Sequence, residues 1–241
     1  MPCNSITKYK GMAKDKLTKV KIYTNQKSPR LFKNKFLELL TKSHPLIIDI
    51  MYAIIAYFLI SYYYNHYDQN IGAITFQFFF GFFSWTLGEY LMHRFLYHRL
   101  DDATYDTGVQ YLFHGIHHYF PDDDSRTVLP PVPSLGIAAL FFGIFYLIIG
   151  RYAFTFGPGF MIGYCAYMTV HYTIHKVPPP KRFNWWWNYH NIHHYQQHDR
   201  AFGVTNPFWD FVFRTLPEKN RRTVDIEVAK PGEEFLKKHS K

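Results

Sequence analysis

The chain has 241 residues, of which 20% are aromatic, and a formal net charge of +9 at pH 7. This length suits one domain with tails, and two cysteines are too few for a disulfide framework or a cysteine-based zinc site. The basic excess does not indicate a nucleic-acid partner, because no recognition helix or RNA-binding motif accompanies it.

The first 45 residues are expected to form a basic cytosolic tail and an interfacial helix. Residues 1–28 are rich in lysine and lack a periodic apolar pattern. Ser28-Pro29 is typical of a helix cap followed by proline at the first helical position. Apolar residues then recur at helical spacing, at Leu31, Phe32, Phe36, Leu39 and Leu40. Together with nearby lysines they predict an amphipathic helix on an anionic membrane surface, with an ordinary surface helix as the alternative.

Four apolar stretches follow the tail, and each has the length of a membrane span. They lie near residues 46–64, 71–91, 132–149 and 151–170. A helix needs about 20 residues to cross the hydrocarbon core of a bilayer. The first two are separated by a short turn at 65–70, and the last two by little more than Gly150. The pattern predicts two transmembrane hairpins.

The distribution of Lys and Arg indicates the orientation of these hairpins. If the N-terminus is inside, 26 of the 27 Lys and Arg residues fall on one side and only Arg151 falls on the other. The side rich in Lys and Arg is normally cytoplasmic. The expected fold is therefore an all-α integral membrane protein of four transmembrane helices with a cytosolic helical cap, in a bacterial inner membrane or the endoplasmic reticulum. Residues 46–216 would form this membrane domain, and 217–241 a polar C-terminal tail on the same cytoplasmic side as the N-terminus.

Ten of the fourteen histidines gather in four clusters on the predicted cytosolic side. The clusters are His93 and His98; His114, His117 and His118; His171 and His175; and His190, His193 and His194. On a helix, positions i, i+3 and i+4 share one face, so each cluster of three can present its imidazoles together. His93 and His98 lie about 140° apart on a regular helix, so they could bind a metal from two sides or require local unwinding.

Neutral imidazole is the commonest side-chain metal ligand and suits iron, zinc, copper and nickel. Ten ligands would serve two metal ions at about five each. A carboxylate-bridged site is not favoured, because no Glu-x-x-His motif occurs and Glu89 is the only glutamate between Glu38 and Glu218. His44, His66 and His239 are expected to be incidental, whereas His198 is either a partner of the ligands or a surface residue.

The clusters and their flanks resemble the fatty acid hydroxylase superfamily of membrane-bound oxygenases, and within it most closely the fatty acid 2-hydroxylases. The resemblance covers about residues 45–216. The matching stretches are Trp85 to Tyr90 followed by His93 to His98; Leu112 to His118 with Arg126 and Leu129 to Pro133; and His190 to His194 with Phe202-Gly203-Val204 and Phe208-Trp209-Asp210. The HGIHH and PPVP stretches are more specific than the histidine spacing, which desaturases and sterol oxidases share.

The resemblance implies O2-dependent hydroxylation of the α-carbon of fatty acids or sphingolipid acyl chains. It implies two iron ions held by the ten histidines, although purified protein could carry zinc. Electrons are expected from a separate protein such as cytochrome b5 or a ferredoxin with its reductase, because the first 45 residues are too short for the cytochrome b5 domain of many relatives. The alternatives are a sister activity, fatty acyl desaturase or sterol C-4 methyl oxidase, and a non-catalytic membrane metal-binding protein.

Four further residues are candidates for contacts with the substrate or with the ligands. A few residues before the third histidine cluster the family often has Tyr-Asp, whereas this chain has Tyr167-Met168. The departure falls at a position that the resemblance implies helps to position the substrate. The others are Arg126, Asp124 and His198. No catalytic group outside the histidines is assigned.

Overall fold

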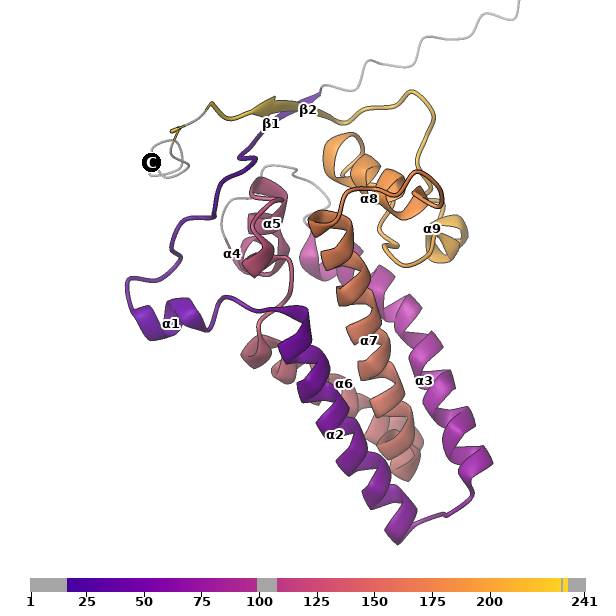
Figure 1. Ribbon diagram of the computed structural model, residues 1–241. Helices are drawn as coiled ribbons and strands as arrows, with labels where there is room; N and C mark the ends of the chain where they lie inside the picture. The colour runs from indigo at the N-terminus through magenta and orange to yellow at the C-terminus, as the bar shows by residue number, and fades with distance from the viewer. Residues whose placement is uncertain (1–16, 99–107, 231, 234–241) are drawn as a thin grey trace, which may run out of the picture.

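Four long helices form a stem that carries a cap of shorter helices at one end (Figure 1). The computed structural model describes residues 17–98, 108–230 and 232–233. The stem helices are α2 (Pro45–His66), α3 (Ile71–Leu91), α6 (Pro131–Ile149) and α7 (Ala153–Lys176). Each apolar stretch identified in the sequence therefore forms a helix, and α7 continues past its expected end to include the third histidine cluster.

Local signals in the sequence set the ends of these helices. The side chain of Asn70 accepts a hydrogen bond from the backbone N–H of Ala73 at 3.1 Å and caps the start of α3. Pro131 occupies the first turn of α6, where the absence of its N–H costs nothing. Gly150 ends α6 with a φ of +57°, which glycine adopts without strain, and begins the turn η4 (Gly150–Tyr152) into α7.

The close packing of α3 against α7 depends on two glycines. A Cβ atom at Gly81 would lie 2.0 Å from the carbonyl oxygen of Phe156, and one at Gly159 would lie 1.9 Å from that of Phe78. Both contacts are with backbone, which cannot move aside as a side-chain tip can. Small residues at such crossings let helix backbones approach closely, as is common in membrane helix bundles.

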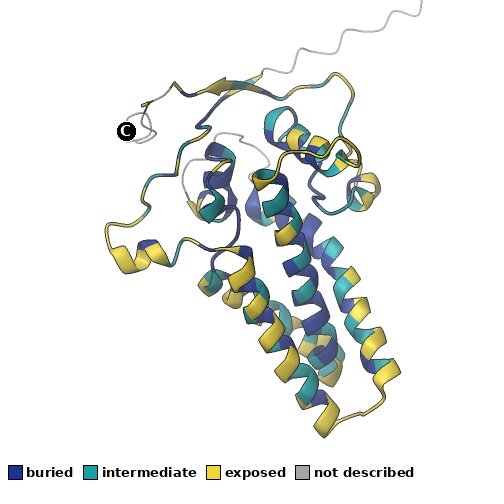
Figure 2. Cartoon of the chain, in the orientation of Figure 1, coloured by how far each residue is buried: buried dark blue, intermediate teal, exposed yellow. Residues whose placement is uncertain are grey.

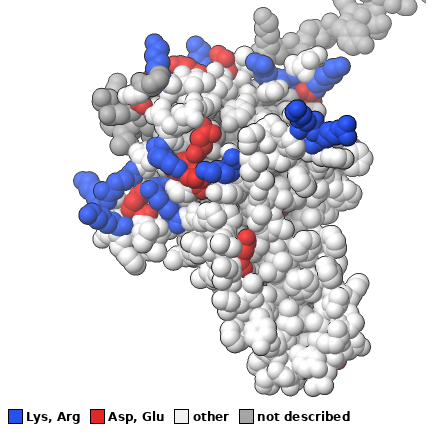
Figure 3. Space-filling view, in the orientation of Figure 1, with Lys and Arg blue, Asp and Glu red and all other residues white. Residues whose placement is uncertain are grey.

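The surface of the stem is apolar. Three stretches of the described chain are long and apolar enough to cross a membrane: Pro45–His66, Ile71–Tyr97 and Asp124–Lys176, the last of which contains both α6 and α7. Leu147 is 85% exposed and Ile148 is 74% exposed, and exposed residues are frequent along α2 and the lower part of α3 (Figure 2). The visible Lys and Arg side chains gather on the cap and on the segment that precedes α2 (Figure 3). A continuous apolar surface of this size is typical of a protein that contacts lipid.

The cap is built from the segments that connect and follow the stem helices. Between α3 and α6 lie the π-helical turn η1 (Met92–Tyr97), α4 (Gly108–Gln110), a second π-helical turn η2 (Tyr111–Gly115), α5 (Ile116–Tyr119) and the turn η3 (Asp124–Arg126). After α7 come α8 (Trp185–Tyr195) and α9 (Phe208–Val212). These short elements place side chains directly above the stem.

The expectation of an all-α fold is wrong in one respect. Strands β1 (Thr18–Ile22) and β2 (Val224–Val228) form a two-stranded parallel sheet, in which Thr18 lies opposite Val224. Part of each predicted tail is therefore ordered, because apolar and charged residues alternate in both strands and the apolar Val20, Ile22 and Val224 are buried against the cap. Residues 1–16, 231 and 234–241 of the expected tails lie outside the described residues.

The predicted helix after Ser28-Pro29 is shorter than expected. Helix α1 covers only Lys35–Leu39 and is capped by Asn34, whose side chain accepts the backbone N–H of Phe36 at 2.8 Å. Ser28 does not cap a helix; its backbone N–H donates to Asp123 at 2.9 Å instead. The apolar residues of this region thus lie mostly in irregular chain, which explains why helical periodicity overestimated the length of the helix.

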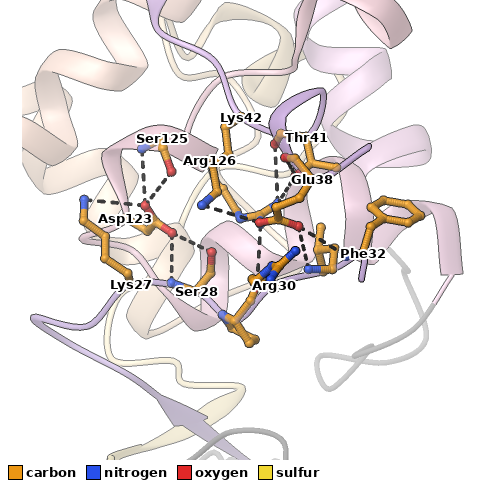
Figure 4. Close-up of polar contacts among 12 residues, drawn as sticks. Lys27, Ser28, Arg30, Phe32, Glu38, Thr41, Lys42, Asp123, Ser125 and Arg126 are labelled. Atoms are coloured by element: carbon orange, nitrogen blue, oxygen red, sulfur yellow. Dashed lines mark hydrogen bonds and ion pairs between the residues drawn. The ribbon is translucent and has the colours of Figure 1, made fainter. Parts of the chain in front are cut away.

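Two buried carboxylates fasten the segment before α2 to the cap (Figure 4). Glu38 accepts the backbone N–H of Leu31 at 2.9 Å and forms an ion pair with Arg126 at 2.7 Å. Asp123 accepts the backbone N–H of Ser28 and also binds the Ser125 hydroxyl at 2.8 Å. These contacts hold the segment beside the turn that leads into α6.

Candidate metal centre

The ten clustered histidines converge in two groups of five above the stem. The first group comprises His93, His98, His114, His118 and His193, and the second comprises His117, His171, His175, His190 and His194. Within each group, one nitrogen from every ring lies within 4.8 Å of the others. The groups share a wall, because the rings of His118 and His194 stack with centroids 3.9 Å apart.

The two groups are built in the same way. Each takes two histidines from the end of a stem helix or the turn that directly follows it, two at positions i and i+4 of one cap segment, and one from the other cap segment. His117 and His118 are adjacent in the sequence but belong to different groups, as do His193 and His194. Consecutive residues on a helix point about 100° apart, so each cluster of three serves both groups rather than one.

The spacing of His93 and His98 is accommodated by the π-helical turn η1. Its i to i+5 hydrogen bonds bring residues five apart onto nearly the same face, and the two rings lie 4.9 Å apart between centroids. Of the two arrangements that the sequence left open for this pair, the structure has the local unwinding. A second π-helical turn, η2, contains His114.

The distances between imidazole nitrogens fit a bound cation. In the first group Nε2 of His93 lies 3.1 Å from that of His114 and 3.1 Å from that of His98. In the second group Nε2 of His175 lies 3.0 Å from that of His117 and 2.9 Å from that of His190. One proton can satisfy one such pair but not several nitrogens that converge on one point, whereas a cation can accept all the lone pairs.

Buried nitrogens without partners support the same conclusion. Nε2 of His118, Nε2 of His171 and both ring nitrogens of His194 are buried and have no hydrogen-bond partner in the described part of the chain. Leaving a buried polar atom unpaired costs about 1–3 kcal/mol. A metal ion in each group would bind the lone pairs of such nitrogens and remove this cost.

Two backbone carbonyls orient ligands of the first group. Nδ1 of His93 lies 2.6 Å from the carbonyl oxygen of Phe202, and Nδ1 of His193 lies 2.7 Å from that of Arg200. A carbonyl oxygen only accepts, so Nδ1 of each ring carries the proton and Nε2 presents a lone pair to the centre of the group. Such contacts fix both the tautomer and the orientation of a metal-binding histidine.

Two buried carboxylates hold the loop that carries these carbonyls. Asp210 accepts the backbone N–H groups of Phe202 at 3.0 Å and Gly203 at 2.8 Å. Glu89 accepts the backbone N–H of Thr205 at 2.8 Å and its hydroxyl at 2.6 Å. Neither carboxylate was expected to support the site, although the position of Asp210 within a short aromatic motif was a visible signal.

Burial keeps the cap imidazoles neutral. It lowers the pKa of the histidines on α5, η2 and α8 well below the usual value, and repulsion from neighbouring imidazoles lowers it further; these are His114, His117, His118, His190, His193 and His194. The neutral ring is the form that binds a metal. At neutral pH the centre is therefore ready to accept cations without first losing protons.

The four other candidate residues take different positions. Tyr167 stacks on His171 with centroids 5.8 Å apart, beside the second group. His198 binds the Thr223 hydroxyl at 2.9 Å through Nδ1 and shares a cavity with His98, His118 and His194. Arg126 is paired with Glu38, and Asp124 with Lys27 and Lys176, so the polar contacts of both lie outside the two groups.

Of the histidines expected to be incidental, His44 caps α2 and His66 contacts the Tyr62 carbonyl; His239 lies outside the described residues.

An apolar cavity leads from the stem toward the centre. It lies between α2, α3, α6 and α7 and offers about 390 Å3 of space, counting the part that is open to the surroundings. A smaller cavity of about 240 Å3 reaches His114, and the two share Tyr97, Leu129 and Tyr164 as lining residues. Tyr97 stacks on His114 in the first group, as Tyr167 stacks on His171 in the second. Each group is thus bounded by a tyrosine on the side of the smaller cavity.

The fatty acid hydroxylase family model matches residues 78–215. The ceramide very long chain fatty acid hydroxylase of Schizosaccharomyces pombe is 35% identical over 211 residues, which cover 83% of this chain and 58% of that protein. A dihydroceramide fatty acyl 2-hydroxylase of Arabidopsis thaliana is 33% identical over 193 residues, which cover 78% of this chain and 80% of that protein. Human fatty acid 2-hydroxylase is 38% identical over 152 residues, which cover 58% of this chain and 39% of that protein.

The fold is also similar to a solved structure. The hydroxylase domain of scs7p superimposes with a TM-score of 0.72 at 31% identity, over 83% of this chain and 76% of that one. The chain spans about half the length of the S. pombe relative and less of the human one. The matched residues include both histidine groups and the loop that orients them.

Proposed function

The chain belongs to the fatty acid hydroxylase family, and on that premise we propose that it hydroxylates the α-carbon of a fatty acyl chain. The acyl group is carried by a free fatty acid or by a sphingolipid, since the relatives are named for fatty acid and ceramide substrates. The observation that carries the proposal is the position of two five-histidine groups beside a cavity that reaches His114 and shares lining residues with the apolar cavity of the stem.

The two groups are proposed to hold one metal ion each, with the ten histidines as ligands. Iron bound there supplies the chemistry of O2 activation, with O2 as co-substrate and electrons from an electron-transfer protein such as cytochrome b5 or a ferredoxin. An all-imidazole set binds zinc as well, so zinc is expected in protein purified without added iron.

The residues of this chain position the substrate and exclude water. The stem cavity is lined almost entirely by apolar side chains and suits the hydrocarbon tail. Tyr97 and Tyr167 lie between this cavity and the histidines, with their rings stacked on His114 and His171. A phenol at this point can donate a hydrogen bond to the acyl carbonyl, which would hold the adjacent carbon beside the centre.

The orientation in the membrane follows from charge. We place the cap and both termini in the cytoplasm, because 26 of the 27 Lys and Arg residues flank the stem on that side. The four stem helices would cross the bilayer as two hairpins. The centre then lies just above the hydrocarbon region, within reach of a lipid whose headgroup stays at the interface.

The test is a lipid analysis of cells that express the chain in a host without 2-hydroxylated acyl chains. We expect 2-hydroxy acids with the wild-type protein and none above background with His117→Ala or His193→Ala, which remove one ligand from each group. Both variants should still appear in the membrane fraction. New double bonds or oxidised methyl groups in place of 2-hydroxy acids would show a sister activity. Bound metal without any oxidised lipid, with a reductase supplied, would show a metal-binding protein.

A further inference from the structure

The stem cavity has a defined direction along α6 and α7. On α6 its lining residues run from Ser134 near the cap to Phe145 deep in the stem, and on α7 they run from Tyr164 to Gly157. The two helices are joined at Gly150, so the deep ends of both series lie near this turn. A tail that enters from the histidine side therefore advances toward Phe145 and Gly157.

Aromatic rings bound the deep end of the cavity. Phe145 packs edge to face against Phe156 and Phe160, with centroids 4.8 Å and 5.0 Å apart. Phe142 lies over Gly157, where an added Cβ would meet its ring at 3.1 Å. These rings are held by their neighbours on α7, so they form a fixed boundary in the path of the tail.

We propose that Phe142 and Phe145 set the upper limit on the length of the acyl chain that the protein accepts. This inference rests on the proposed function, because it takes the acyl tail as the occupant of the cavity. The occupant is an unbranched hydrocarbon chain, since the lining is apolar and the adjoining cavity, which shares Tyr97, Leu129 and Tyr164 as walls, reaches His114.

The span of the lining residues is comparable to the length of an acyl tail. Ser134 and Phe145 are eleven residues apart on one helix, which corresponds to roughly 16 Å at about 1.5 Å per residue. An extended hydrocarbon chain advances about 1.25 Å per methylene, given a C–C bond of about 1.5 Å. The lining thus spans the length of roughly a dozen methylenes.

Two substitutions change the length of the cavity in opposite directions. Phe145→Ala removes the ring at the deep end and should admit chains longer by about two to four carbons, at about 1.25 Å per methylene. Ala138→Leu adds a side chain halfway along the lining and should exclude the longest chains. Matched controls on the same helix are Leu147→Ala, since Leu147 is 85% exposed, and Gly143→Leu, since a Cβ at Gly143 meets nothing within 4 Å.

The experiment measures chain length twice, in the lipids that co-purify with the full chain and in the 2-hydroxy acids that cells accumulate. The expected result is a shift to longer chains for Phe145→Ala, a shift to shorter chains for Ala138→Leu, and the wild-type distribution for both controls. Unchanged distributions in both cavity variants would overturn the proposal. If one variant fails to fold, the other still decides, because each predicts a shift of known sign.

The two readouts separate this inference from the proposed function. Shifted chain lengths among the retained lipids, with no 2-hydroxy acid from any form of the protein, would support the length limit and reject the hydroxylase. Wild-type distributions of retained lipid and product in both cavity variants, with normal total 2-hydroxylation, would reject the length limit alone. A shift in the control variants equal to that in the cavity variants would also reject it.

Discussion

Asp210→Asn should weaken metal binding by the first histidine group without changing the second. One carboxylate oxygen of Asp210 accepts the backbone N–H of Phe202 and the Thr215 hydroxyl, and the other accepts the backbone N–H of Gly203. Asparagine keeps one acceptor oxygen but points an N–H group at a donor. A lost bond to a charged group is worth about 1.5–3 kcal/mol. The Phe202 carbonyl passes this loss of free energy on to His93. The metal ion in the first group should therefore bind roughly 10- to 100-fold more weakly.

The assay is a competition titration of purified protein with Zn2+ and a chromophoric chelator. Wild-type protein should bind two ions, and Asp210→Asn should retain one of wild-type affinity and one that is weakened. Asp225→Asn makes the same chemical change at an exposed position on β2 and should behave like wild type. Equal weakening of both ions, or wild-type binding of both, would refute the argument that the Phe202 carbonyl orients one group only.

Three further predictions concern the ligands, the helix packing and the N-terminal segment. His117→Ala and His193→Ala should each reduce 2-hydroxylation at least 100-fold while circular dichroism stays helical; a variant that keeps full activity would contradict the ligand assignment. Gly159→Ala should destabilise the protein by about 3 kcal/mol or more, because its Cβ meets a backbone carbonyl oxygen of α3 at 1.9 Å; thermal unfolding in detergent checks this, with Gly143→Ala as the control. Burial raises the pKa of Glu38, but backbone hydrogen bonds and its arginine partner hold it below the usual value on balance. Glu38→Gln should therefore cost about 3 kcal/mol at pH 7, and this difference should shrink as the pH falls below about 4; a difference independent of pH would refute it.

The sequence predicts the stem well because its signals are local. Each stem helix is a continuous apolar run, and three of the four have a cap or a proline at their start, as at Asn70 for α3 and Pro131 for α6. The ten histidines could also be found, since their spacing is compatible with helices. The unwinding near His93 was one of two arrangements that its five-residue spacing to His98 left open, because a regular helix does not bring these residues together.

The division of the histidines into groups required the tertiary structure. Sequence spacing places His190, His193 and His194 on one face, but the structure sends His193 to one group and the other two to the second. The assignment depends on where a cap helix sits relative to two different stem helices, which spacing alone does not encode. Helical geometry did contain a partial signal, because neighbours such as His193 and His194 point about 100° apart.

The contacts between segments that are distant in the sequence could not be predicted from the sequence either. Strands β1 and β2 show alternating apolar and charged residues, but each has only five residues and its partner lies at the other end of the chain. The pairing of Glu38 with Arg126 likewise joins residues with no common motif. Such contacts depend on the path of the chain, which is set by the stem and cap.

The most direct test of the account is the position and source of the oxygen added to the lipid. Purified protein loaded with iron would be supplied with an acyl substrate, a reductase system and 18O2, and the product analysed by fragmentation mass spectrometry. The account predicts one 18O atom on the carbon next to the carbonyl, and its loss when a ligand such as His117 or His193 is replaced. Oxygen derived from water, or label on another carbon, would contradict it.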